Sequence, residues 1–464
     1  MLHTLSASQI VTQVQQGGLR VPELADALCT RIEALNPQLN AFVSFDADLV
    51  RRQAWHIQNR VAAGERLPLA GVPVSVKDNL WVGGSPASCG SRFFADFIAP
   101  RDSWSVARLR DAGALILGLT NCSEFACKGV TSNPLHGATR NPWNPALTPG
   151  GSSGGAVAAV AAGLGPLALA TDSGGSTRRP AAHTGLVGFK PTAGRVPHPW
   201  GFPDPTQLLN AIGQIGRSVS DVELMLRTLT GHDGGDPLAS PSPLATGAPP
   251  LRIAWSPDLG LGYPLDEAVR HCLENLISHL RKAGWQIEEA APQWPATLAD
   301  TNLMALQHAG LAELFGARHQ HDPELFDPLI AAQIEAGQSI SGAAVVKLLL
   351  LREQIVAQMA RFFEDYDLLL CPTVPCEAWP LDQLGPARIG GQPAGPRGHA
   401  VFTPLFNHAG VPALSLPCGF GPQGLPLGLQ IVGPRFADLG VLAAAARIEN
   451  LLGLDFSSPL LNTP

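Results

Sequence analysis

Two glycine- and serine-rich clusters could carry chemistry: GGSSGG at residues 150–155 and SGGS at residues 173–176. Glycine permits backbone conformations in which several N–H groups converge on one point. A loop that opens onto a helix adds free N–H donors and the positive end of the helix dipole. Such a loop can hold an oxyanion or a phosphate. Phosphate is disfavoured, because GGSSGG lacks the Lys-Ser/Thr ending of a phosphate-binding P-loop.

A third candidate is Lys77, which ends the apolar, β-rich run LAGVPVSVK at 69–77. A lysine is normally a cation at neutral pH, but burial lowers its pKa and could make it a base. Val72, Val74 and Val76 supply an apolar setting that suits such a shift. Taken alone, a glycine-rich loop is most often only a loop, and a lysine after a strand is most often solvated.

In combination, these motifs resemble those of the amidase signature family. GGSSGG is followed by a helix and a strand, then by DSGGSTRRPA at 172–181 and GLVGFKP at 185–191, as in that family. The family's lysine motif is present as GVPVSVKD at 71–78. The likeness spans about residues 20–450 and includes three further family-like stretches: NPWN at 141–144, GVPA at 410–413 and GLPLGLQIVG at 424–433.

The resemblance implies a catalytic role for three residues. Ser176 would be the nucleophile, Ser152 the bridging serine held by a cis peptide bond, and Lys77 the general base. A serine hydroxyl needs a base to become a good nucleophile, and a second hydroxyl can relay the proton because it both donates and accepts. The oxyanion would be held by backbone N–H groups, assigned to Ser173, Gly174 and Gly175.

The expected reaction is therefore acyl transfer to water. Ser176 would attack an amide carbonyl, and Lys77 would take up the proton through Ser152 and return it to the leaving amine. By the resemblance, the chain needs no metal and no organic cofactor. Asp172 and Arg178 are interpreted as an ion pair that braces the nucleophile loop, and Arg179 is given no role.

Several other polar residues near the motifs are assigned no chemistry. His136, His183 and His198 are interpreted as packing or loop residues, because the mechanism needs no histidine. Cys122 and Cys127 lack the further cysteines or histidines of a metal site and are interpreted as buried thiols.

The substrate is expected to be a small amide, an aryl amide or a carbamate. Residues 124–132 resemble a loop that lines the acyl site in this family, so Cys127 and Lys128 are candidate substrate contacts. Trp200 and Phe202 could form an apolar wall or could equally anchor a surface loop.

Two alternative functions remain. The glutaminase subunits of tRNA-dependent amidotransferases belong to the same family, but they usually carry an acidic residue just before the FT of a C-terminal motif. Here the motif is HAVFT at 399–403, which has no carboxylate and disfavours glutamine. A non-catalytic scaffold with this fold is the other alternative, against which the intact Lys77, Ser152 and Ser176 argue.

The pattern of elements predicts an α/β fold with a mixed, largely parallel central sheet covered by helices on both faces. We expect one amidase domain over 1–464, with residues 258–366 as a helical cap or subdomain and 231–250 as a linker. A helix should begin at Pro22 and end at Pro37. The uncharged run 154–171 should form a short buried helix and a strand rather than a membrane span.

Composition narrows the class of protein. The 464 residues are 45% hydrophobic and 15% charged, which excludes a disordered chain. The net charge of -7 and the lack of basic clusters argue against a nucleic-acid partner. Eight cysteines without a CxxC pair and an N-terminus without signal-peptide features predict a cytoplasmic protein with no membrane partner. The oligomeric state stays open, with a homodimer as one option.

Overall fold

The computed structural model of the protein describes residues 1–244 and 252–463. In this part of the chain eleven strands form one central sheet. In chain order they are β1 (Phe42–Phe45), β2 (Pro73–Lys77), β3 (Leu115–Thr120), β6 (Leu167–Asp172), β7 (Val187–Lys190), β8 (Ala211–Gly216), β9 (Ile253–Trp255), β10 (Ile287–Glu289), β11 (Leu368–Pro372), β14 (Ala413–Phe420) and β15 (Pro426–Val432). Two small ribbons are made by β4 (Ser132–Asn133) with β5 (Gly137–Ala138) and by β12 (Arg388–Ile389) with β13 (Gln392–Pro393).

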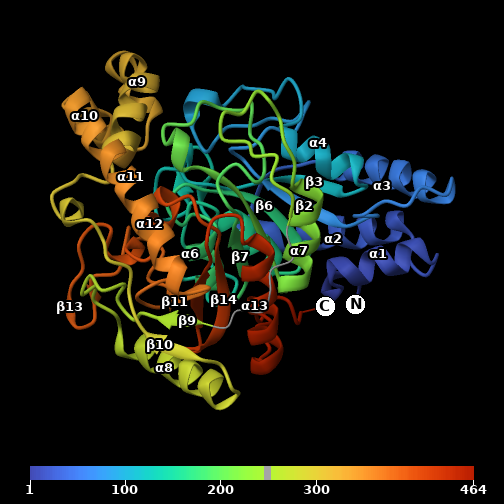
Figure 1. The fold of residues 1–464 in the computed structure, drawn as a ribbon. Coiled ribbons are helices and arrows are strands. Elements are labelled where there is room, and N and C mark those ends of the chain that lie inside the picture. Colours follow the sequence, from blue (N-terminus) through green and yellow to red (C-terminus); the bar gives the residue numbers. More distant parts are fainter. Residues whose placement is uncertain (245–251, 464) are drawn as a thin grey trace.

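The helices surround this sheet (Figure 1). They are α1 (Ala7–Gln15), α2 (Val21–Leu39), α3 (Ala47–Ala62), α4 (Trp104–Asp111), α5 (Gly154–Ala161), α6 (Arg178–Thr184), α7 (Val219–Leu229), α8 (Glu267–Lys282), α9 (Ala305–His321), α10 (Pro328–Gln338), α11 (Gly342–Asp365), α12 (Pro404–His408) and α13 (Asp438–Leu452). Their buried residues recur at helical spacing, as in α8, where Val269, Leu273, Leu276 and Leu280 face the interior.

The strand order is β1-β3-β2-β6-β8-β7-β14-β15-β11-β9-β10. The sheet is mixed, as expected, but it is not largely parallel. Four neighbouring pairs are parallel, β3–β2, β2–β6, β11–β9 and β9–β10, and the other six are antiparallel. The difference arises in the middle of the sheet, where β14 and β15 form a hairpin and β8 runs against both of its neighbours.

Both faces of the sheet are covered. Every residue of β6, β8 and β15 is buried, although successive side chains of a strand point to opposite faces. Helices α5 and α6 contact one another as well as the central strands, and α7 and α13 form a second pair that does the same. This agrees with the prediction of an α/β fold whose sheet is enclosed by helices.

Some of the predictions for individual segments are confirmed and others are not. The run 154–171 folds as α5 followed by β6, both fully buried, as predicted. The described residues contain no helix that is long and apolar enough to cross a membrane. Helix α2, however, continues through Pro37 and ends at Leu39, because Asn40 takes the left-handed conformation there. Of the expected linker 231–250, residues 245–250 lie outside the described residues.

The segment 258–366 divides into two parts. Its first part joins the sheet layer, since α8 packs against β14 and β15 and β10 forms the edge strand. Helices α9, α10 and α11 lie together at one end of the molecule, where α9 contacts both of the others (Figure 1). Within this segment α9–α11 therefore form a group of helices in contact through α9, whereas α8 contacts the sheet.

Candidate active site

Strand β2 carries Lys77 into the interior of the protein. The strand lies between β3 and β6, its five residues are buried, and Lys77 has no exposed surface. The Lys77 Nζ donates hydrogen bonds to Ser152 Oγ at 2.8 Å and to Thr171 Oγ1 at 2.9 Å. The ammonium group therefore has two hydroxyl partners and no carboxylate in direct contact within the described residues.

Burial changes the acid–base behaviour of this lysine. The loss of solvation lowers the pKa of Lys77 to about 8, and the negative charge of Asp172 opposes this shift only in part. Roughly a tenth of the amine is then neutral at pH 7 and about half at pH 8. This is the condition that a lysine must meet to act as a base.

The GGSSGG loop brings Ser152 to the lysine. The Gly151–Ser152 peptide bond is cis. A Cβ on Gly151 would lie within 2.9 Å of three backbone atoms of Val130, so this position needs a glycine. The loop is also held by Thr131, whose Oγ1 donates to the Gly150 carbonyl at 3.0 Å and accepts from the Gly154 N–H at 2.8 Å.

Ser176 lies on the second loop, between β6 and α6. Its side chain is 7% exposed and borders a cavity of about 190 Å³, whereas Ser152 and Lys77 are fully buried and do not line that cavity. No hydrogen bond joins Ser176 Oγ to Ser152 or Lys77 among the described residues. The structure thus brings the lysine and the bridging serine into contact and puts the expected nucleophile at the cavity wall.

The backbone N–H groups around Ser176 differ in availability. The Gly175 N–H, one of the three donors expected for the oxyanion hole, donates to Asp172 Oδ1 at 2.7 Å. Within residues 1–244 and 252–463, the N–H groups of Ser173, Gly174 and Ser176 have no protein acceptor. These three donors are free to bind an oxygen atom in the cavity.

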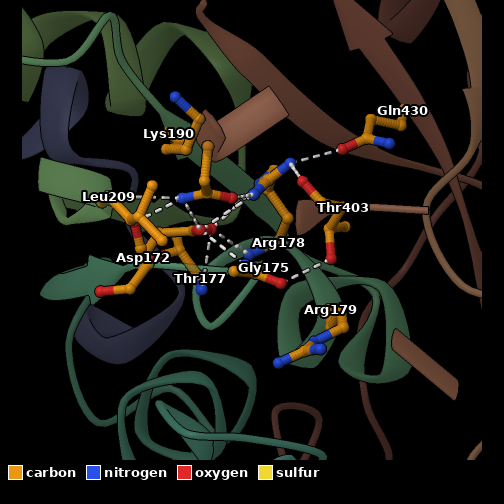
Figure 2. Close-up of polar contacts among 12 residues, drawn as sticks. Asp172, Gly175, Thr177, Arg178, Arg179, Lys190, Leu209, Thr403 and Gln430 are labelled. Atoms are coloured by element: carbon orange, nitrogen blue, oxygen red, sulfur yellow. Dashed lines mark hydrogen bonds and ion pairs between the residues drawn. The ribbon is translucent and has the colours of Figure 1, made fainter. Parts of the chain in front are cut away.

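A buried ion pair braces the loop, as predicted. Arg178 donates to Asp172 through Nη2 at 2.9 Å and Nε at 3.0 Å, and both side chains have no exposed surface. Figure 2 shows how Asp172 and Arg178 stand at the centre of the polar contacts. Arg178 also donates to Thr403 O, Asn407 Oδ1 and Gln430 Oε1, so the nucleophile loop is tied to the C-terminal part of the chain.

The two candidate substrate contacts both line the cavity. Lys128, however, donates to Asp327 Oδ2 at 2.5 Å and to Ser132 Oγ at 3.3 Å, so its charge already has a partner. The Cys127 thiol is buried, and burial raises its pKa well above the ordinary value. Cys127 therefore presents an uncharged thiol to the cavity, and the positive charge of Lys128 is neutralised by Asp327.

The aromatic segment after residue 195 serves mainly to anchor its loop. Phe202 is buried in a cluster with Phe94, Phe97 and Trp81. Trp200 fixes the loop, because its Nε1 donates to Asp102 O at 3.0 Å and the Arg101 guanidinium lies over its ring. Neither Trp200 nor Phe202 lines the cavity that contains Ser176.

The histidines and cysteines near the motifs make packing and hydrogen-bond contacts. His136 bonds Ser88 Oγ at 2.9 Å, His183 packs edge-on against Trp379, and burial lowers the pKa of His183 to about 3. Across the described ranges no group of histidine, cysteine, aspartate or glutamate side chains has the arrangement of a metal site. Cys122 and Cys127 are free, buried thiols, as expected.

Three further residues of the site were not assigned to it from the sequence. Thr171 holds the Lys77 amine, and its hydroxyl also accepts from Asn79 Nδ2 at 2.9 Å. Thr403 donates to the Gly174 carbonyl at 2.7 Å, from a segment more than two hundred residues away. Arg397 lines the cavity from a loop outside every motif. Two of the three had a local signal, because Thr171 directly precedes the DSGGS motif and Thr403 is the threonine of the HAVFT motif.

Known proteins resemble the chain over nearly its full length. The sequence profile of the family described as Amidase matches residues 23–442. An acylamidase of Rhodococcus erythropolis is 38% identical over 97% of this chain and 95% of its own. A glutamyl-tRNA(Gln) amidotransferase subunit from Symbiobacterium thermophilum is 35% identical over 95% of both chains.

Solved structures give the same result. The crystal structure of a bacterial aryl acylamidase of the amidase signature family superimposes with a TM-score of 0.90 at 30% identity, covering 100% of this chain and 99% of the other. A 6-aminohexanoate cyclic dimer hydrolase superimposes with a TM-score of 0.87 at 27% identity, covering 99% and 100%.

Proposed function

We infer the mechanism from the premise that this chain belongs to the amidase signature family and hydrolyses carbon–nitrogen bonds in amides. We propose that Ser176, Ser152 and Lys77 perform this reaction. Ser176 is the nucleophile, Ser152 relays the proton and neutral Lys77 is the base. The observation that carries this assignment is the 2.8 Å contact between Lys77 Nζ and Ser152 Oγ, behind a cavity bordered by Ser176.

The reaction begins when Ser176 Oγ attacks the amide carbonyl carbon. The Ser176 proton moves to Ser152, and the Ser152 proton moves to the Lys77 amine. Thr171 accepts a hydrogen bond from Lys77 and so keeps the amine directed at Ser152. The N–H groups of Ser173, Gly174 and Ser176 stabilise the oxyanion of the tetrahedral intermediate.

The intermediate collapses when the carbon–nitrogen bond breaks. The proton held by Lys77 returns through Ser152 to the leaving nitrogen, and the amine departs. Water then attacks the acyl-enzyme with help from the same two residues, which releases the acid and restores the Ser176 hydroxyl. Each step uses only residues of this chain and water.

The cavity favours an amide that has no α-ammonium group over free glutamine. Among the described residues that line it there is no aspartate or glutamate that could hold the α-ammonium group of glutamine. Apolar residues such as Leu303, Met304 and Leu405 form much of its wall. Together with the likeness to an acylamidase and an aryl acylamidase, this supports small acyl, aryl or carbamate substrates, with a glutaminase function as the alternative.

The test is a hydrolysis screen with purified protein. We expect release of aryl amine from acyl anilides, detected by its absorbance, and no release of ammonia from glutamine. A parallel set of aliphatic amides and aryl carbamates shows which leaving groups and which acyl groups the enzyme accepts. Ammonia released from glutamine faster than aryl amine from every anilide would instead assign the chain to the glutaminase class.

The pH dependence of the reaction should report the titration of Lys77. Only the unprotonated amine accepts a proton, so kcat/KM should fall about tenfold for each pH unit below the pKa of Lys77, about 8, and level off about one unit above it. The measurement is kcat/KM for a neutral anilide whose own groups do not titrate in this range. A profile that stays flat over roughly two pH units below that pKa would contradict a lysine base.

A further inference from the structure

Arg179 is a buried cation without a counter-ion among the described residues. It follows Arg178 in the first turn of α6, is 3% exposed and lines the cavity beside Ser176. Its Nε and Nη1 have no hydrogen-bond partner, and its Nη2 reaches only the Gly151 carbonyl at 3.5 Å. In Figure 2 its guanidinium lies apart from the contacts that saturate Arg178.

The cavity around Arg179 has an excess of positive charge. Lys128 is neutralised by Asp327. Arg397 lines the same cavity and forms no ion pair with any described residue. His408, also on the wall, is neutral near pH 7, since burial lowers its pKa to about 4. Two guanidinium groups therefore face the cavity, and the described part of its lining offers them no carboxylate.

A buried cation without a partner is costly, and such a group in a cleft is typical of a ligand site. Burial, with the nearby charge of Arg397, lowers the pKa of Arg179 to about 9, which agrees with a position that needs an anion. Guanidinium forms its strongest hydrogen bonds with carboxylates and phosphates. The missing partner of Arg179 is thus expected to arrive with the substrate.

We propose that Arg179 binds a carboxylate of the substrate and that the enzyme prefers amides that carry an acidic group. The inference rests on the proposed function, because Ser176 must attack the same molecule. Ser176 and Arg179 are close in the chain and both line one cavity, so the carboxylate lies a few bonds from the scissile carbonyl. Arg397 also lines an adjoining cavity of about 790 Å³. The two cavities share Cys127, Lys128 and Met304, so Arg397 adds a positive charge where they meet.

The test uses matched substrates that differ only in charge. One pair has the carboxylate on the acyl side: the mono-p-nitroanilide of glutaric acid and the p-nitroanilide of pentanoic acid. The other has it on the amine side: the pentanoyl amides of 4-aminobenzoic acid and of aniline. We expect kcat/KM to be at least about tenfold higher for the acidic member of one pair, which also tells which side of the amide Arg179 binds.

The Arg179→Met variant should reduce the ratio of kcat/KM between the acidic and the neutral substrate to about one or below. Arg179→Lys should retain part of this preference, because the charge remains but the planar guanidinium is lost. Arg352→Met is the matched control. It removes an arginine of α11 whose Nε is also without a partner but which does not line this cavity, so the ratio should not change. A preference for the neutral member of both pairs in the unmodified enzyme would overturn the proposal.

A second measurement does not need turnover. Glutarate should bind the Ser176→Ala variant in calorimetry, and the additional Arg179→Lys change should weaken this binding several-fold. If no amide is hydrolysed but glutarate binds through Arg179, the proposed function fails and the carboxylate site stands. If anilides are hydrolysed without a preference for charge and glutarate does not bind, the carboxylate site fails and the proposed function stands.

Discussion

Replacing Ser176 by alanine is expected to lower kcat/KM for anilide hydrolysis by about 10⁴-fold or more, because the acyl-enzyme can no longer form. The substitution removes one oxygen atom at the cavity wall. It breaks no hydrogen bond of Ser176 Oγ to another described residue, so thermal unfolding should be nearly unchanged. The measurement is steady-state release of aryl amine, with the unfolding transition recorded on the same preparation.

Ser153→Ala provides the control. Ser153 is the next residue after Ser152 and is buried, and its Oγ has no hydrogen-bond partner. This variant should retain activity within a few-fold of the unmodified protein. Near-normal hydrolysis by Ser176→Ala would remove Ser176 from the mechanism, and an equal loss in Ser153→Ala would mean that the loop tolerates no substitution at all.

Replacing Asp172 by alanine is expected to lower the free energy of unfolding by about 3–5 kcal/mol, because it leaves Arg178 charged and buried without its partner. Burial alone would raise the pKa of Asp172, but Arg178 and further hydrogen bonds hold it well below its usual range. The variant also loses the acceptor of the Gly175 and Thr177 N–H groups. Chemical denaturation followed by fluorescence and circular dichroism gives the measurement.

The matched control is Glu223→Ala, which breaks the partly exposed surface pair between Glu223 and Arg227 on α7. Exposed pairs contribute little, so we expect a change below about 1 kcal/mol. If Asp172→Ala were as mild as Glu223→Ala, the buried pair would not be what holds the nucleophile loop.

The sequence was most informative where function depends on one short stretch of chain. The resemblance of GGSSGG and DSGGSTRRPA to the amidase signature motifs indicated Ser152 and Ser176, and the valines before Lys77 indicated the burial that shifts its pKa. The same segment predicted α5 and β6, because an apolar run of that length that is interrupted by glycines and a proline must turn inside the core.

Features that depend on long-range pairing were harder to predict. Runs of buried strand residues look alike in parallel and antiparallel sheets, so the antiparallel centre around β8 and β14 did not follow from the pattern. The expectation that Pro37 ends a helix was wrong, because α2 accommodates this proline two residues before its terminus. Arg397 lies outside every motif, and although Thr403 belongs to the HAVFT motif, its contact with Gly174 is a tertiary contact that no local pattern encodes.

The ties between the Ser176 loop and distant parts of the chain bear on how the enzyme matures. Arg178 contacts Thr403, Asn407 and Gln430, which a ribosome adds more than two hundred residues after the loop itself. A nascent polypeptide that has emerged only as far as β11 would contain the proposed catalytic residues Lys77, Ser152 and Ser176 but none of these supports. Hydrolytic competence should therefore be acquired late, only after translation has passed Gln430.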